Sequence, residues 1–184
     1  MRPILFYTVG LPGAGKSTFA RQLAFLLGGK VLRGDVIGLE LFRLPTYSPE
    51  ERKMVYAEMS RRATTSLRAG EHVFYDAATN TQAQREAVVA LAEQNGAEAL
   101  GVWIETPIAI AKRRAASPRD KGVAGRVVRI IPPHIFDQYA AAFELPDDNE
   151  VIVQLSGTAP FFLQYRRLYR YLRAQGIRPP RLVN

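Results

Sequence analysis

One segment near the start of the chain has the residue types and spacing of a phosphate-binding loop. Residues 10–17 read Gly-Leu-Pro-Gly-Ala-Gly-Lys-Ser, which matches G-x-x-x-x-G-K-[S/T] in full. The glycines allow backbone angles that a Cβ would forbid, and they let amide N–H groups approach a phosphate. Lys16 would bring a full positive charge to the β- and γ-phosphates, and Ser17 a hydroxyl ligand for Mg²⁺. The pattern predicts a site for a nucleoside triphosphate with Mg²⁺.

The elements on either side of this segment support that interpretation over a chance match in a glycine-rich turn. The apolar run 4–9 precedes it, and an amphipathic repeat over 17–27 follows it. A buried strand followed by a helix would direct the positive end of the helix at the anion. The predicted nucleotide-binding residues are Gly10, Leu11, Pro12, Gly13, Ala14, Gly15, Lys16, Ser17 and Thr18.

Two aspartates follow predicted strands and are candidates for the rest of the chemistry. Asp76 closes the apolar run 72–76 and is expected to bind Mg²⁺, although it could instead cap a turn. Asp35 follows the predicted strand 30–34 and is expected to act as general base, although it could instead cap a helix over 36–43. Ligands bind at the carboxyl ends of parallel strands, so both should lie near the phosphate loop.

Apolar runs alternate with helical patterns along the chain, which indicates βαβ units and a parallel sheet. Ser48-Pro49 with Glu51, and Thr81 with Gln84, have the spacing of helix capping boxes. We therefore expect an α/β fold in one domain spanning residues 1–184. The expected strands cover residues 4–9, 30–34, 72–75, 100–104 and 151–155. The expected helices cover 17–27, a stretch from 49 to Gly70, 81–95, stretches starting near 107 and 132, and 159–175.

Composition limits the class of protein. Of the 184 residues, 47% are hydrophobic and 23% charged, which is ordinary for one globular domain. The absence of cysteine excludes disulfides, zinc–thiolate sites, iron–sulfur clusters and a cysteine nucleophile. No uncharged apolar run approaches the ~18 residues of a membrane-spanning helix. We therefore expect a cytoplasmic protein without a membrane span.

The net charge of +8 is unevenly distributed. After Glu150 the sequence holds six arginines and no acid, which leaves +2 for residues 1–150. The predicted helix 159–175 is amphipathic, with arginines on one face. Such a helix can bind a membrane surface or nucleic acid, but more often its arginines are simply solvated. No obligate protein partner is inferred.

A phosphate loop alone does not separate a switch, a motor and a kinase. GTPases carry D-x-x-G after the third strand and N-K-x-D for guanine, whereas residues 76–79 read Asp-Ala-Ala-Thr and N-K-x-D is absent. Ring-forming motors usually have a helical lid domain and a much longer chain. A small kinase needs a lid with arginines, and the basic segment 112–130 predicts one, with a solvated surface loop as the alternative.

Four segments occur in the order seen in small P-loop kinases: residues 10–18, 32–35, 76–80 with Arg85, and 112–114. Over about residues 3–155 the chain resembles the group that holds the polynucleotide 5′-kinase domain, the zeta toxins and chloramphenicol phosphotransferase, many of them bacterial predicted kinases labelled AAA-family ATPases. The resemblance implies the P-loop nucleoside triphosphate hydrolase fold. That fold is a three-layer α/β/α sandwich with a five-stranded parallel sheet in the order 2-3-1-4-5.

The resemblance also implies roles for individual residues. Lys16 and Ser17 would bind ATP-Mg²⁺, Asp35 would activate a hydroxyl, and a lid arginine would reach the phosphates. The arginine candidates are Arg113 and Arg114, and the residues implied near the acceptor are Asn80 and Arg85. The chain departs from the D-x-x-R pattern of polynucleotide kinases because Gly38 stands in the place of the arginine, which Arg33 or Arg43 could replace.

The sequence therefore predicts a kinase that transfers the ATP γ-phosphate to a hydroxyl of a small molecule or of a nucleic-acid end. Two alternatives stay open at this point. One is a nucleotide-binding regulatory ATPase without a dedicated acceptor, and the other is a 5′-polynucleotide kinase.

Overall fold

A five-stranded sheet forms the centre of the molecule, in the order β2-β3-β1-β4-β5, with every neighbouring pair parallel. The computed structural model describes residues 2–42, 45–46, 48–117, 130–180 and 182. The strands are β1 (Ile4–Val9), β2 (Lys30–Arg33), β3 (Val73–Asp76), β4 (Glu98–Glu105) and β5 (Ile152–Ser156). Both the predicted α/β fold and the strand order implied by the resemblance are confirmed.

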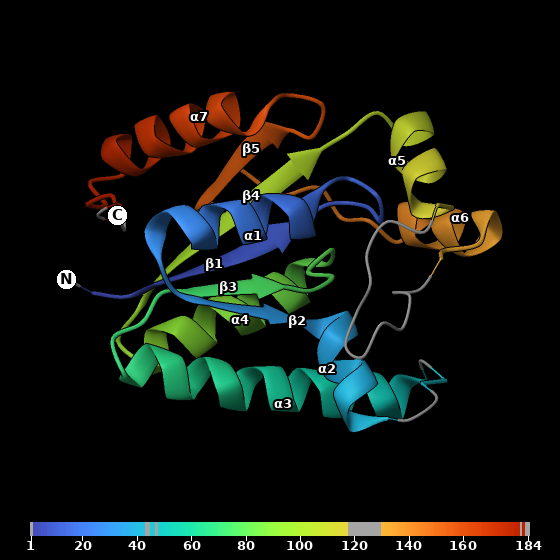
Figure 1. Cartoon of the computed structure of the whole chain (residues 1–184), viewed down its shortest axis with the longest axis horizontal. Coiled ribbons are helices and arrows are strands. Elements are labelled where there is room, and N and C mark those ends of the chain that lie inside the picture. The colour runs from blue at the N-terminus through green and yellow to red at the C-terminus, as the bar shows by residue number, and fades with distance from the viewer. Residues whose placement is uncertain (1, 43–44, 47, 118–129, 181, 183–184) are drawn as a thin grey trace.

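Helices cover both faces of this sheet, which makes three layers (Figure 1). On one face, α1 and α7 pack against the sheet around Leu23 and Leu168. On the other face, α2, α3 and α4 enclose a second core around Met59 and Val88. The helices are α1 (Lys16–Leu27), α2 (Gly34–Leu41), α3 (Pro49–Arg68), α4 (Gln82–Gln94), α5 (Ile108–Ala115), α6 (Pro133–Ala141) and α7 (Phe161–Ala174).

Local signals explain where several of these elements begin. β1 is buried at all six positions, as expected for a central parallel strand with helices on both faces. At α4, Thr81 and Gln84 form the complete predicted capping box. At α3, the Ser48 hydroxyl accepts a hydrogen bond from the N–H of Glu51, while the Glu51 carboxylate accepts one from the N–H of Thr46.

The carboxyl ends of the strands meet at one edge of the sheet, where α2, α5 and α6 also lie (Figure 1). The register places Arg33 beside Asp76 and Val9 beside Trp103. The chain segments that leave β1, β2 and β3 therefore start close together.

Two expectations fall partly outside the described part of the chain. Residues 118–129 of the predicted lid lie outside it, and so does Arg43. Lys112 to Ala115 form the last turn of α5, and residue 130 resumes the described chain shortly before α6. Among the described residues, no helix has the length and apolar character needed to cross a membrane.

Candidate functional site: two cavities around the phosphate loop

The phosphate loop connects β1 to α1 at the carboxyl edge of the sheet, as predicted. Gly13 has φ +77°, and a Cβ there would collide with the carbonyl oxygen of Ala111 in α5. Only glycine fits this position, because both its backbone conformation and its contact with α5 exclude a side chain. The loop is thus packed between the sheet and α5.

Lys16 extends back over the loop that precedes it. Its ammonium group donates hydrogen bonds to the carbonyl oxygens of Gly10, at 2.7 Å, and Leu11, at 3.0 Å. Burial lowers the pKa of Lys16, and the nearby carboxylates of Asp76 and Asp35 oppose that shift. The cation is therefore held in a low-dielectric position where a phosphate oxygen would interact strongly with it.

Asp76 lies at the end of β3, beneath the start of α1. Its side chain is buried, and its carboxylate accepts hydrogen bonds from the hydroxyls of Ser17 and, at 3.3 Å, Thr8. Burial raises the pKa of Asp76, whereas the Ser17 hydrogen bond and the charge of Lys16 lower it. The structure thus brings together the two residues predicted to bind Mg²⁺.

Asp35 lies in the first turn of α2, where Arg33 is the N-cap residue. Arg33 donates two hydrogen bonds to the Asp35 carboxylate, at 3.1 and 2.8 Å, and its Nε lies 3.9 Å from Asp76. The alternative expectation, that Asp35 caps a helix over 36–43, is wrong by position, because the helix begins at Gly34. The bidentate Arg33 pair fixes the orientation of the Asp35 carboxylate.

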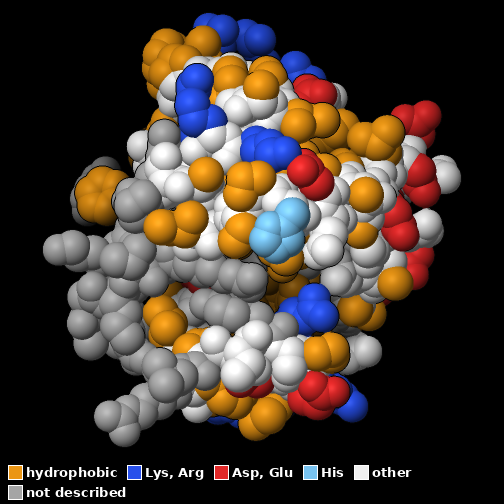
Figure 2. All heavy atoms as spheres, turned by 90° about the vertical axis from the view of Figure 1, so that its right-hand side faces the viewer, with side chains coloured by type: hydrophobic (Ala, Val, Ile, Leu, Met, Phe, Trp, Pro, Cys, Tyr) orange, Lys and Arg blue, Asp and Glu red, His pale blue; other side chains and the backbone are white. Residues whose placement is uncertain are grey.

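Two cavities open on opposite sides of this cluster. The first cavity measures about 390 Å³ and is lined by the phosphate loop, the start of α1, Arg114, and the segment that joins β5 to α7. The second cavity measures about 340 Å³ and is lined by α2, the first half of α3 and the segment that follows Asp76. The cavities share Gly13, Lys16, Ser17, Asp35 and Ile131. Figure 2 looks onto this edge of the sheet, where the surface is hollowed.

Of the two candidate arginines of α5, one lines the first cavity and the other does not. Arg114 lines the first cavity, and its Nη1 donates a hydrogen bond to the carbonyl oxygen of Gly157 at 2.9 Å. Arg113 is exposed and lines neither cavity. Of the two, the geometry favours Arg114 for contact with a bound nucleotide.

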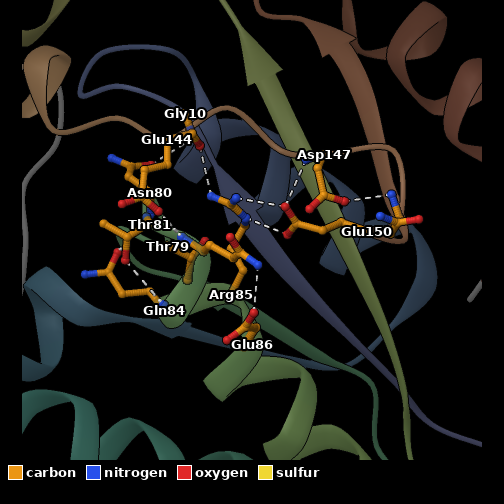
Figure 3. Close-up of polar contacts among 12 residues, drawn as sticks. Gly10, Thr79, Asn80, Thr81, Gln84, Arg85, Glu86, Glu144, Asp147 and Glu150 are labelled. Carbon is orange, nitrogen blue, oxygen red and sulfur yellow. Dashed lines mark hydrogen bonds and ion pairs between the residues drawn. The ribbon is translucent and has the colours of Figure 1, made fainter.

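Asn80 contacts the phosphate loop (Figure 3). Its side-chain oxygen accepts a hydrogen bond from the N–H of Gly10 at 3.1 Å, and the Thr79 hydroxyl donates to the carbonyl oxygen of Thr8 at 2.7 Å. Asn80 is buried and lines neither cavity. Its place in the structure is that of a residue supporting the loop, which differs from the expected place beside the acceptor.

Arg85 also differs from the expectation. It is 1% exposed, lies within α4, and pairs through two hydrogen bonds of 2.6 and 2.8 Å with Glu150 (Figure 3). A third hydrogen bond goes to the carbonyl oxygen of Glu144. Because these partners occupy its guanidinium and it lines neither cavity, Arg85 joins α4 to the segment that precedes β5 and is not placed to contact an acceptor.

Several residues of the site carry no sequence motif. Thr106, just after β4, donates a hydrogen bond from its hydroxyl to the carbonyl oxygen of Ala14 at 2.9 Å and so supports the loop from the side opposite Asn80. Arg52, Tyr56 and Tyr139 line the second cavity. Since α3 and α6 are far apart in sequence, only the fold could place these three residues together.

The donor atoms near the phosphate loop fit Mg²⁺. The Ser17 hydroxyl and the Asp76 carboxylate supply the oxygen ligands that Mg²⁺ prefers, and they already touch each other. Within the described ranges, no group of three or more His, Asp or Glu side chains forms a metal cage. Mg²⁺ in nucleotide sites usually takes only one or two protein ligands, so this set is sufficient.

Comparison with known proteins agrees with this geometry. The chain is similar in structure to a sugar kinase from Janibacter sp. HTCC2649, with 15% identity and a TM-score of 0.69 over 93% of this chain and 95% of that one. It is similar to a gluconokinase from Sinorhizobium meliloti 1021, with 16% identity and a TM-score of 0.68 over 95% and 94% of the two chains.

A third similar structure is the Mycobacterium tuberculosis APS kinase in complex with AMPPNP and APS, with 19% identity and a TM-score of 0.65 over 94% and 98% of the two chains. No curated protein matches the sequence. The family model described as an AAA domain matches residues 5–146, which include the phosphate loop, Asp35, Asp76 and α5. The chain therefore belongs to this AAA domain family and has the P-loop nucleotide-binding fold.

Proposed function

We propose that the protein is a kinase that transfers the γ-phosphate of ATP to a hydroxyl group of a small molecule. The observation that carries this proposal is that two cavities meet at Lys16, Ser17 and Asp35. A switch or a regulatory ATPase needs only the first cavity. A second cavity of comparable size, which reaches the same lysine and ends at a fixed carboxylate, gives a phosphate acceptor a place to bind.

The first cavity would hold ATP. Its phosphates would lie against the loop backbone and the Lys16 ammonium group, and Arg114, which lines the same cavity, would reach them. Ser17 and Asp76 would hold Mg²⁺, which would supply positive charge to neutralise the phosphate oxygens. Burial lowers the pKa of Lys16, and the charges of Asp76 and Asp35 act against that lowering.

The second cavity would hold the acceptor, with its hydroxyl toward Asp35. The Asp35 carboxylate would accept the proton from the hydroxyl as the oxygen bonds to the γ-phosphorus and the bond to the β-phosphate oxygen breaks. Arg33 holds Asp35 at the junction of the two cavities and adds a positive charge beside the transferred group. Positioning and charge stabilisation thus come from residues already in contact.

The nature of the second cavity favours a small acceptor. Val55, Met59 and Tyr56 form an apolar wall along α3, and Arg52 provides a cation there. The structural neighbours named as sugar kinase, gluconokinase and APS kinase support a small hydroxyl compound. A nucleic-acid end would have to enter without the arginine of the D-x-x-R pattern, since position 38 is Gly38 in α2.

The test is an acceptor screen with ATP labelled at the γ-phosphate. Sugars, sugar acids, polyols, nucleosides and oligonucleotides with 5′-hydroxyl ends are each incubated with wild-type protein and with Lys16→Ala. We expect label to appear on at least one small acceptor with the wild type and on none with Lys16→Ala. Label only on oligonucleotide ends would identify a polynucleotide kinase. Release of phosphate to water alone, unchanged by every acceptor, would identify a regulatory ATPase and refute the proposal.

A further inference from the structure

The acidic residues are confined to the middle of the chain, so both of its ends are basic. Residues 1–34 contain five Lys or Arg and no acid, and residues 151–184 contain six arginines and no acid. The intervening residues 35–150 hold the other 14 basic residues together with all 17 acidic ones. The net charge of +8 is therefore the sum of two strongly basic ends and a slightly acidic middle.

The fold brings these two basic ends together. The first segment supplies α1 and the last supplies α7, and both helices pack on the same face of the sheet in one hydrophobic core. Their aromatic side chains touch, since the ring centroids of Phe19 and Phe161 lie 5.8 Å apart. The layer on the opposite face is different, because α3 and α4 carry several glutamates among their basic residues. One face of the molecule is thus basic, with no acid in either of its helices.

The outward surface of α7 combines arginines with aromatic rings. Phe162, Arg166, Tyr169, Arg170 and Arg173 are exposed and recur at helical spacing, so they form one stripe along the helix. Phe162 is 65% exposed and Tyr169 43% exposed. Within the described part of the chain, no acidic side chain forms an ion pair with any of these arginines. Basic side chains also gather at the top of Figure 2, over α7.

The neighbouring helix α1 extends this stripe into a broader surface. Phe25, on its outer face, is 86% exposed. Gln22 in the middle of α1 and Phe161 at the start of α7 also border the first cavity. The two helices that carry the exposed surface therefore also border the first cavity.

We propose that the outer faces of α1 and α7 form a binding surface for single-stranded nucleic acid. Guanidinium groups pair with phosphates and stack on bases, and exposed aromatic rings interleaved with them offer stacking platforms that tolerate any sequence. An anionic membrane is the weaker candidate. An interfacial helix inserts an apolar face, but the apolar face of α7, with Leu168 and Leu172, is buried against the sheet. This surface is separate from the second cavity, so its ligand need not be the phosphate acceptor.

The test measures binding without ATP, so it does not depend on phosphoryl transfer. Fluorescence anisotropy follows labelled oligothymidylate and oligouridylate of about 20 nucleotides as the whole chain is added. With about four arginine–phosphate contacts, we expect the affinity to fall about 50-fold between about 50 and 200 mM salt.

Charge-reversal variants locate the surface. Arg166→Glu/Arg170→Glu should weaken binding at least about tenfold. The matched control Lys53→Glu/Arg68→Glu makes the same change in net charge on α3 and should alter binding less than about twofold. Phe162→Ala/Tyr169→Ala keeps all charges and should weaken binding by at least about fivefold if bases stack there. Circular dichroism confirms that each variant is folded.

The proposal would be overturned if the wild type bound neither oligonucleotide at low salt. It would also be overturned if the α7 and α3 charge variants lost the same amount of affinity for the oligonucleotides. Binding to anionic vesicles without binding to either oligonucleotide would likewise overturn it. A preference for the ribo- or deoxyribo-oligonucleotide would identify which nucleic acid the surface binds.

Discussion

The side-chain oxygen of Asn80 accepts a hydrogen bond from the backbone N–H of Gly10 at 3.1 Å, and this contact joins the end of β3 to the first residue of the phosphate loop. Both groups are buried. A buried amide N–H without an acceptor is costly, so Asn80 stabilises the loop conformation in which the other amides can face a phosphate.

Asn80→Ala should therefore weaken ATP binding. Loss of one buried hydrogen bond corresponds to about 1–1.5 kcal/mol, or a roughly tenfold increase in the Kd for MgATP. Isothermal titration calorimetry measures it directly. Asn95→Ala, the same chemical change at the C-terminal end of α4, is the matched control and should leave the Kd unchanged. An unaltered Kd in Asn80→Ala would show that the loop holds its shape without this contact.

Thr106 is predicted to support the loop from the other side. Thr106→Val keeps the shape of the side chain but removes the hydroxyl that donates to the Ala14 carbonyl oxygen. The KM for ATP should rise by about three- to tenfold because a buried carbonyl loses its donor. Thr106→Ser restores the hydroxyl and should return KM close to the wild-type value. Equal KM values for the serine and valine variants would contradict a role for the hydrogen bond.

Arg85 is predicted to stabilise the folded protein through its ion pair with Glu150. Removing one partner of a buried ion pair leaves the other charge unpaired, so Arg85→Met should lower the free energy of unfolding by about 3–5 kcal/mol in urea titrations. Arg85→Met/Glu150→Leu removes both charges and should recover much of that loss. If the recovered double variant showed a large increase in acceptor KM, Arg85 would have to contact the acceptor after all.

Glu58, a carboxylate of α3 held by two arginines of the same helix, should make stability depend on pH. Hydrogen bonds from Arg61 and then Arg62 lower the pKa of Glu58 from 4.5 to about 2, and Arg62 also pairs with Glu40 on α2. Because the folded-state pKa lies below the unfolded one, this stabilisation is complete above pH 4.5 and is lost as the pH falls toward about 2.

Urea titrations between those two pH values measure the effect. Glu58→Gln should be less stable than the wild type at neutral pH and should lose less stability on acidification. If the free energy of unfolding fell with pH by the same amount in both proteins, Glu58 would be ruled out as a source of the acid sensitivity.

The sequence predicted those features that depend on neighbouring residues. The phosphate loop, the five strands and the capping box at Thr81 are local patterns, and the structure confirms each of them. β4 extends further than expected, from Glu98 to Glu105, because polar residues at its two ends pair with neighbouring strands although they lack an apolar pattern.

Features that depend on distant residues could not be predicted. Arg85 becomes a buried structural residue only because Glu150 lies beside it, 65 positions later in the chain. The resemblance implies a place for Asn80 near the acceptor, and nothing in the neighbouring residues shows that its partner is Gly10, on another strand connection. Thr106 and the residues that line the second cavity belong to no local motif. Their roles depend on the fold, which brings α3, α6 and the strand ends together.

The most direct test of the central claim compares Asp35→Asn with the wild type, using the acceptor that the screen identifies. Asparagine keeps the size of the side chain but accepts a proton poorly. We predict an unchanged Kd for MgATP and a kcat for labelled-phosphate transfer that falls by about 10²–10⁴-fold. A variant that transfers phosphate at the wild-type rate, or one that loses MgATP binding in parallel, would contradict the assignment of Asp35 as the base between the two cavities.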